Sequence, residues 1–241
     1  MIKGLSCPYG QSNLVSTLSG ADRKLIEPHL TPVDLDRGMV LEEADAPIKL
    51  VYFLNSGVGS TVAATTNGRG IEVGLFGLEG MSGSAIAMHD RHSTYETFMQ
   101  IGGTGQSIEP DKLIELMQES PSLQRHLLHY ARVMMTQTSQ TALSNGQSRL
   151  EERLARWLLM CHDRISGDAI RLTHEFLSVM LGVRRAGVTV GTQVLEGKGL
   201  IRADRGRIVI LDRDGLVSEA QETYGIPEAE YARLIGFDRP D

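Results

Sequence analysis

Two consecutive arginines, Arg184 and Arg185, follow a glycine in the stretch formed by residues 172–211. That glycine, Gly182, stands four residues after the small Ser178, and aliphatic residues surround the pair. A small residue, a turn glycine and aliphatic residues at these offsets are typical of a helix-turn-helix, whose second helix enters the DNA major groove. Arginines at the start of that helix reach base edges and phosphates. The stretch therefore predicts DNA recognition.

Strand-like segments at residues 200–202 and 207–210 follow, with turn residues at 204–206, and they predict a small hairpin beside the two helices. Residues 188–194 are rich in β-branched side chains and on propensity alone favour a strand. We predict a helix there because a strand would leave Gly182 without a role. The alternative is an ordinary helical hairpin with surface arginines. The candidate DNA-contacting residues are Thr173, Arg184, Arg185, Ala186, Thr189 and Arg205.

These side chains need a scaffold, and the upstream sequence changes to a period of two from Val33 onward. Short strand candidates separated by Gly, Pro or Asn, with a hairpin signal at Asn67-Gly68, predict an antiparallel roll or barrel. Residues 122–144 then show a long helical pattern with apolar positions recurring near every 3.5 residues, the spacing of a coiled-coil seam.

Residues 172–211 resemble the winged helix-turn-helix of the Crp/Fnr family of bacterial transcription regulators. The likeness extends upstream through residues 51–53, 72–75, 77–81 and 152–159. It implies an α+β fold with four parts. These are an antiparallel β jelly roll of the cyclic-nucleotide-binding type (1–121), a long dimerisation helix and hinge (122–145), a C-terminal winged helix-turn-helix (146–214) and a helical tail (215–241).

The resemblance also implies an effector pocket in the roll, where a glycine-rich loop and a glutamate hold a cyclic nucleotide and an arginine pairs with its phosphate. Here the glutamate, Glu79, matches only with a one-residue offset, and the arginine, Arg91, is out of register. We therefore expect a degenerate pocket that does not bind cyclic AMP, and either another small effector or none. The candidate pocket residues are Gly77, Glu79, Gly80, Met81, Ser82, Arg91, Ser93 and Thr94.

In the family the long helix is the dimer interface, and an operator of two half-sites requires a dimer. The residues predicted to form this interface are Leu127, Tyr130, Met134, Thr138 and Thr141. The alternative is a helix packed on its own jelly roll, and both hold if one face packs internally while another meets a second subunit.

Charge and cysteine content agree with this organisation. Residues 148–214 carry a net charge of +3 and the rest of the chain −9, within a total of −6, as for a basic reader joined to an acidic domain. Two cysteines, Cys7 and Cys161, are too few for an iron–sulfur cluster or a disulfide framework. No apolar run approaches the ~20 residues of a membrane span. We expect a cytoplasmic protein without a metal, a cofactor or a membrane partner.

The predicted function is a homodimeric, sequence-specific regulator of transcription that binds double-stranded DNA and is not an enzyme. The resemblance adds RNA polymerase as a further partner. One alternative is a metal-dependent, cupin-like jelly-roll enzyme with a regulatory tail, its metal held by Glu79, His89 and His92; but residues three apart on a strand point to opposite faces. The other is a protein–protein adaptor that uses the winged helix as its docking surface.

Overall fold

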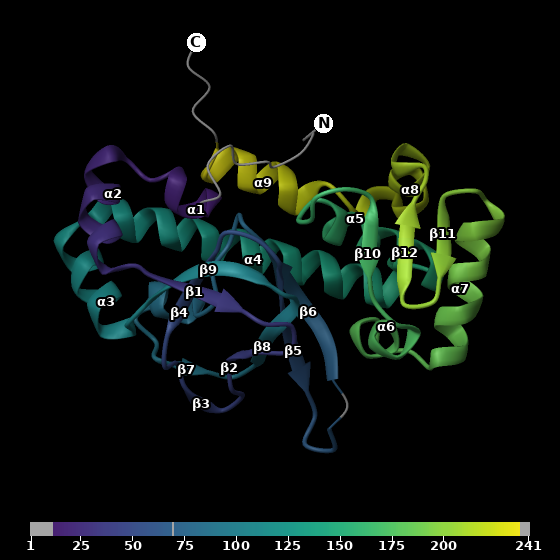
Figure 1. The fold of residues 1–241 in the computed structure, drawn as a ribbon, viewed down its shortest axis with the longest axis horizontal. Coiled ribbons are helices and arrows are strands. Elements are labelled where there is room, and N and C mark those ends of the chain that lie inside the picture. Colours follow the sequence, from purple (N-terminus) through teal and green to yellow (C-terminus); the bar gives the residue numbers. More distant parts are fainter. Residues whose placement is uncertain (1–11, 69, 237–241) are drawn as a thin grey trace, which may run out of the picture.

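The computed structural model describes residues 12–68 and 70–236, so Cys7 lies outside the described residues. Figure 1 shows a β-rich roll at one end, a helical domain with a small sheet at the other, and one long helix running beside both. The chain enters through three short helical segments, α1 (Asn13–Ser16), α2 (Gly20–Ile26) and η1 (Glu27–His29).

The roll consists of antiparallel strands, as predicted. A three-stranded sheet has the order β1-β9-β4, a four-stranded sheet has the order β2-β8-β5-β6, and β3 pairs with β7. Its strands are β1 (Thr31–Leu35), β2 (Val40–Glu42), β3 (Ala46–Pro47), β4 (Val51–Leu54), β5 (Val58–Ala64), β6 (Gly70–Phe76), β7 (His92–Ser93), β8 (Glu96–Ile101) and β9 (Gly103–Ile108), with a 3-10 helix η2 (Ser84–Met88) before β7. The predicted hairpin turn at Asn67-Gly68 joins β5 to β6.

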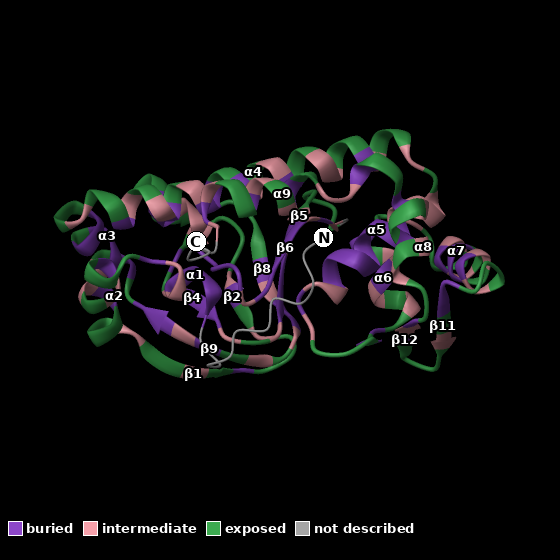
Figure 2. Cartoon of the chain, turned by 90° about the horizontal axis from the view of Figure 1, so that it is seen from above, coloured by how far each residue is buried: buried purple, intermediate pink, exposed green. Residues whose placement is uncertain are grey.

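Helix α3 (Pro110–Glu119) leads into the long helix α4 (Pro121–Gln147). The Ser120 hydroxyl caps α4 by accepting a hydrogen bond from the Leu123 amide at 3.3 Å. Helix α4 lies along one edge of the molecule (Figure 2). It continues through Asn145-Gly146 to Gln147, beyond residue 145, the predicted end of the helix and hinge. A glycine inside a helix costs only about 1 kcal/mol relative to Ala, which does not stop a helix of this length.

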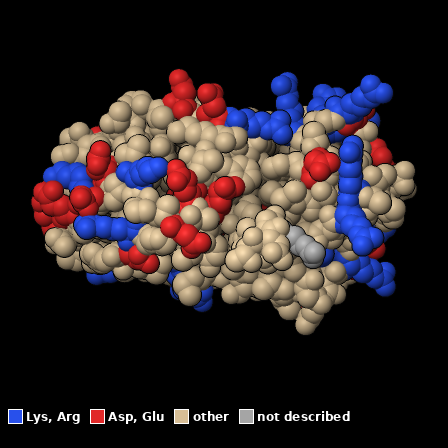
Figure 3. Space-filling model, turned by 90° about the horizontal axis from the view of Figure 1, so that it is seen from below, with Lys and Arg blue, Asp and Glu red and all other residues tan. Residues whose placement is uncertain are grey.

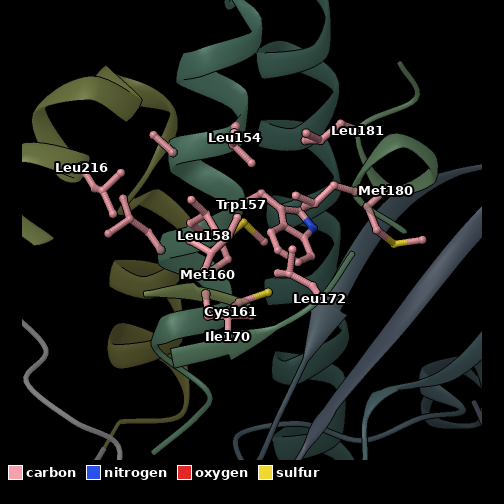
Figure 4. Close-up of a cluster of buried hydrophobic side chains, with 14 of the residues drawn as sticks. Leu154, Trp157, Leu158, Met160, Cys161, Ile170, Leu172, Met180, Leu181 and Leu216 are labelled. Carbon is pink, nitrogen blue, oxygen red and sulfur yellow. The ribbon is translucent and has the colours of Figure 1, made fainter. Parts of the chain in front are cut away.

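The second domain, called the winged domain here, begins with α5 (Leu150–His162), followed by β10 (Ala169–Arg171), α6 (His174–Met180) and α7 (Arg185–Gly197). Strands β11 (Ile201–Asp204) and β12 (Arg207–Ile210) form the predicted hairpin, and α8 (Arg213–Ala220) closes the domain. The hairpin gains a third strand that the sequence did not predict, in the order β10-β12-β11. Figure 4 shows the core, in which Trp157 and Leu158 of α5 meet Ile170 of β10 and Leu216 of α8.

The C-terminal tail has two roles. Helix α8 packs on α5, but after η3 (Gln221–Thr223) the chain returns to the roll, where α9 (Ile226–Leu234) lies against α4. The Tyr231 ring is buried in the same core as Leu127 and Tyr130 of α4. The tail therefore contacts both the winged domain and the roll, whereas the sequence predicted only that it is helical.

In the described part of the chain, no helix combines the length and the apolar character needed to cross a membrane.

Candidate nucleic-acid interface

The turn between α6 and α7 depends on Gly182. Its φ of +62° lies in the left-handed region, and a Cβ there would stand 2.8 Å from Cδ1 of Ile71 on β6. The turn is closed by the Val183 amide, which donates to the Ser178 carbonyl at 2.9 Å. Gly182 is thus required both for the turn and for the close approach of the roll, and α6, the turn and α7 form the predicted helix-turn-helix.

The start of α7 projects into solvent. Arg184, Arg185 and Ala186 are all exposed at its first turn. Arg185 contacts Glu175 at 3.5 Å through an ion pair whose side chains are 69% and 74% exposed. Exposed pairs of this kind contribute about 0–1 kcal/mol, so Arg185 can exchange this partner for a nucleic-acid base at small cost.

A hollow of about 440 Å³ separates α7 from the β11–β12 hairpin. It brings four of the six predicted DNA-contacting residues together: Thr173, Arg185, Thr189 and Arg205. Arg184 and Ala186 do not line it. The lining residues that were not predicted as DNA contacts include Gln193 and Arg207. The helical period places Gln193 on the face of Arg185 and Thr189, a signal that could have identified it.

The two threonines already have structural roles. The Thr173 hydroxyl caps α6 by accepting a hydrogen bond from the Phe176 amide at 3.2 Å. Thr189 donates to the Arg185 carbonyl at 3.2 Å and lies 3.2 Å from Nδ1 of His174. Arg205, by contrast, is exposed in the turn of the hairpin. Figure 3 shows Lys and Arg side chains gathered over the winged-domain end of the molecule, as expected of a surface that meets phosphates.

In the candidate effector loop of the roll, the Glu79 carboxylate is bound by a side chain of the same chain. The Glu79 carboxylate accepts a hydrogen bond from Nε of Arg164, beyond the end of α5, at 2.6 Å, and both side chains are only 8% exposed. The same carboxylate accepts the Gly77 amide at 3.1 Å, and a Cβ on Gly77 would lie 2.9 Å from the Arg164 side chain. Glu79 is therefore committed to an internal cation.

The remaining pocket candidates do not face one open site. Gly80 and Met81 lie under Tyr130, whose hydroxyl donates to the Met81 carbonyl at 3.1 Å, and Ser82 accepts the Tyr52 amide at 3.0 Å. Arg91 points to the surface, where it pairs with Asp111 at 2.6 Å. Ser93 lies on β7 and Thr94 just after it. The loop residues Gly77, Glu79, Gly80, Met81 and Ser82 thus cluster, and Arg91 is separate from them.

The metal alternative has no support in the geometry. His89 contacts Gln124 at 2.8 Å, while Glu79 is held by Arg164. Among the residues that the structure describes, no three His, Cys, Asp or Glu side chains are placed to hold an ion together.

The roll and the winged domain share a buried contact that we call the domain joint. It comprises Ile71, Glu72 and Glu79 of the roll with Trp157, Arg164 and Gly182 of the winged domain. The Glu72 carboxylate accepts hydrogen bonds from Ser60 and, at 2.8 Å, from Nε1 of Trp157. Phe176 of α6 meets both Phe98 and Trp157 edge-on, with ring centroids 6.5 Å apart in each pair. One apolar core therefore continues across the joint.

Burial raises the pKa of Glu72 from 4.5 to about 7, although the hydrogen bonds from Ser60 and Trp157 act in the opposite direction. Between these two pH values the folded chain holds a proton that the unfolded chain has released, so the free energy of unfolding falls as the pH rises. The contribution of Glu72 is fully present below pH 4.5 and is lost as the pH passes 7.

We expect the free energy of unfolding of the wild type to fall by on the order of 3 kcal/mol between pH 4.5 and 7.5 because of Glu72. In Glu72→Gln, which keeps an oxygen acceptor for Trp157 but cannot ionise, this part of the slope should vanish. Urea unfolding of both proteins across this pH range measures the difference. Identical slopes would contradict the assignment.

Helix α4 places the predicted dimer residues on the face that is turned toward the chain's own roll. Leu127 and Tyr130 are each 1% exposed and pack on the chain's own roll, and Met134 lies beside Gly74 of β6. This corrects the predicted seam, because Leu127 and Tyr130 have no surface left for a second subunit. Thr138 is exposed but donates to the Val73 carbonyl, and Thr141 is half-buried.

The opposite face of α4 carries a second heptad series, which we call the outer stripe: Leu128, Arg132, Met135, Ser139 and Ala142. All five residues are exposed, and the apolar members Leu128 and Met135 are 38% and 59% exposed. Spacings of four and three residues produce the a and d positions of a coiled coil. The outer stripe therefore has the spacing of a surface that can pair with another helix.

Comparison with known proteins gives one matching domain family. Residues 152–219 match the Crp-like helix-turn-helix domain. No curated protein matches the chain.

Several solved structures share the fold over most of both chains. A Crp/Fnr-family protein from Eubacterium rectale ATCC 33656 is 19% identical, with a TM-score of 0.68 over 86% of this chain and 97% of that one. FixK2 from Bradyrhizobium japonicum is 16% identical, with a TM-score of 0.67 over 80% and 98%. TTHA1359, a transcriptional regulator of the CRP/FNR family from Thermus thermophilus, is 19% identical, with a TM-score of 0.64 over 79% and 98%. At these identities the likeness establishes the fold, a jelly roll with a winged helix-turn-helix.

Proposed function

We propose that this chain controls transcription in the cytoplasm by binding specific DNA sites as a homodimer. Its fold and its Crp-like helix-turn-helix domain are those of a Crp/Fnr-type regulator. The observation that carries the proposal is the exposed start of α7, where Arg185 stands beside the hollow and the hairpin supplies Arg205 and Arg207. In this arrangement α7 enters the major groove and the hairpin meets the flanking backbone.

The position of helix α4 supports the proposed dimer. Helix α4 extends toward the winged domain (Figure 1), so two copies joined along their outer stripes present two α7 helices related by a two-fold axis. Half-sites about 34 Å apart on one face of the duplex would match such a pair.

The roll is proposed to act without cyclic AMP. A bound cyclic nucleotide needs a carboxylate for its ribose and a cation for its phosphate, and burying either group unpaired would be costly. In this chain Glu79 is neutralised by Arg164, and Arg91 is paired with Asp111 at the surface. An effector of another chemistry would have to bind elsewhere in the roll.

The test of DNA readout compares two arginines with different expected roles. Arg185→Ala should cost about 1–3 kcal/mol of binding and remove the preference for one guanine per half-site, because arginine pairs with its O6 and N7. Arg205→Ala should weaken all sequences alike and flatten the salt slope by about one unit per half-site, as expected of a phosphate contact. Selection of bound sequences from random DNA, followed by salt titrations, measures both effects. If Arg185→Ala left the base preferences intact, Arg185 would not read a base.

A further inference from the structure

Helix α7 has a buried side and an outward side, and all of its residues are described. Val188, Gly191, Thr192 and Leu195 form the buried side, which packs on α5. Directly opposite, exposed to solvent, lie Ala186, Val190, Gln193 and Gly197. Residues seven apart on a helix differ in direction by only about 20°, so Ala186 and Gln193 point the same way.

The outward side of α7 carries both apolar and polar side chains. Ala186 and Val190 offer methyl groups, and Val190 is 59% exposed. Gln193 is the member of this side with side-chain donors and acceptors, and it makes no hydrogen bond to another described residue. An exposed amide and two exposed aliphatic side chains in one row suit a surface that meets base edges.

The surroundings of Gln193 favour a base over a phosphate. Gln193 lines the hollow, one turn beyond Thr189 and two beyond Arg185 on α7. Of the two carboxylates that line the same hollow, Asp204 is paired with Arg207 at 3.2 Å, whereas Glu196 has no cation partner among the described residues. Glu196 is fixed there by accepting the Ala203 amide at 2.6 Å. The negative charge of Glu196, one turn beyond Gln193 on α7, disfavours a phosphate beside Gln193, whereas it does not prevent a neutral amide from pairing with a base.

We propose that Gln193 is a specificity-determining residue that reads an adenine in each half-site. The amide of glutamine matches adenine N6 and N7, and the methyl groups of Ala186 and Val190 match the thymine methyl. Eight residues of helix rise about 12 Å, so for a helix lying along the groove the adenine is roughly three to four base pairs from the guanine of Arg185. This inference rests on the proposed function and adds to it the sequence that the helix recognises.

The experiment selects bound sequences from random double-stranded DNA with the full chain and four variants. Gln193→Ala should lose its preference at the adenine position by about tenfold, while the guanine position stays. Gln193→Glu should exchange adenine for cytosine, whose N4 amino group donates to a carboxylate. Arg185→Ala should show the reverse pattern, with adenine retained and guanine lost. Gln118→Ala makes the same change at an exposed position of α3 in the roll and should select the wild-type sequence.

Three other outcomes of this experiment would contradict the inference. If Gln193→Ala weakens all sequences equally, Gln193 contacts a phosphate and the inference is wrong. If Gln193→Ala and Gln193→Glu select the wild-type sequence, the residue lies outside the groove and the inference is also wrong. In both cases a lost guanine in Arg185→Ala would leave the proposed function intact. A wild-type chain that selects no sequence would overturn both together.

Discussion

Met135→Glu should sediment as a monomer at micromolar concentration and bind its DNA site about 10²–10⁴-fold more weakly than the wild type, because a monomer loses the gain from two linked half-sites. In a parallel pair of α4 helices, a residue on the two-fold seam faces its own counterpart. The substitution would therefore bring two carboxylates together at the centre of the outer stripe. Burying like charges without partners opposes association strongly.

The matched control is Met88→Glu. Met88 is 53% exposed at the end of η2 in the roll, close to the 59% of Met135, and it lies off the outer stripe. This variant should remain a dimer with unchanged DNA affinity. Sedimentation and a binding titration on the selected DNA sequence measure both proteins. A dimeric Met135→Glu protein with wild-type affinity would show that the subunits associate through another surface.

The sequence could not identify this face of α4. The predicted seam at Leu127 and Met134 and the outer stripe at Leu128 and Met135 differ by one residue, and both have heptad spacing. A helix between a roll and a second subunit has two apolar faces with the same period. Which face packs internally depends on contacts such as that of Tyr130 with the Met81 carbonyl, 49 residues apart. Periodicity alone carries no information about them.

The helix-turn-helix was more predictable because its signals are local. Gly182 adopts its positive φ within a single turn, and the hairpin turn is closed by residues 204–206, so short-range rules suffice. Strand β10 has only three residues, Ala169–Arg171, and exists because it pairs with β12 about forty residues later. No pattern of that length predicts a strand by itself.

The partner of Glu79 in the effector loop could not be predicted from the sequence either. The loop motif around Glu79 is visible in the sequence, but its partner Arg164 follows 85 residues later, in the connection between α5 and β10. An arginine in a turn is usually a solvated surface residue. Only the packing of the winged domain against the roll buries it beside Glu79.

The buried ion pair between Arg164 and Glu79 is the basis of a second prediction with a large expected effect. Arg164→Ala should lower the free energy of unfolding by about 3–5 kcal/mol, because it leaves the Glu79 carboxylate buried without its cation. The variant also loses the hydrogen bond of 2.6 Å from Nη1 of Arg164 to the Met160 carbonyl. Since Glu79 and Arg164 belong to the two sides of the domain joint, the winged domain should separate from the roll before the roll unfolds. Unfolding followed by Trp157 fluorescence should therefore precede the loss of far-ultraviolet circular dichroism.

Arg91→Ala provides the comparison, because its ion pair with Asp111 has the same length of 2.6 Å but side chains that are 59% and 79% exposed. Water screens that pair, so its loss should cost about 0–1 kcal/mol. The double variant Glu79→Leu/Arg164→Met, with no buried charge at this position, should recover most of the stability that Arg164→Ala loses. Urea denaturation of the three variants measures the loss of stability in each. It therefore tests whether the burial of an ion pair, and not its length, decides how much the pair contributes. If Arg164→Ala lost no more stability than Arg91→Ala, the pair would not hold the roll and the winged domain together.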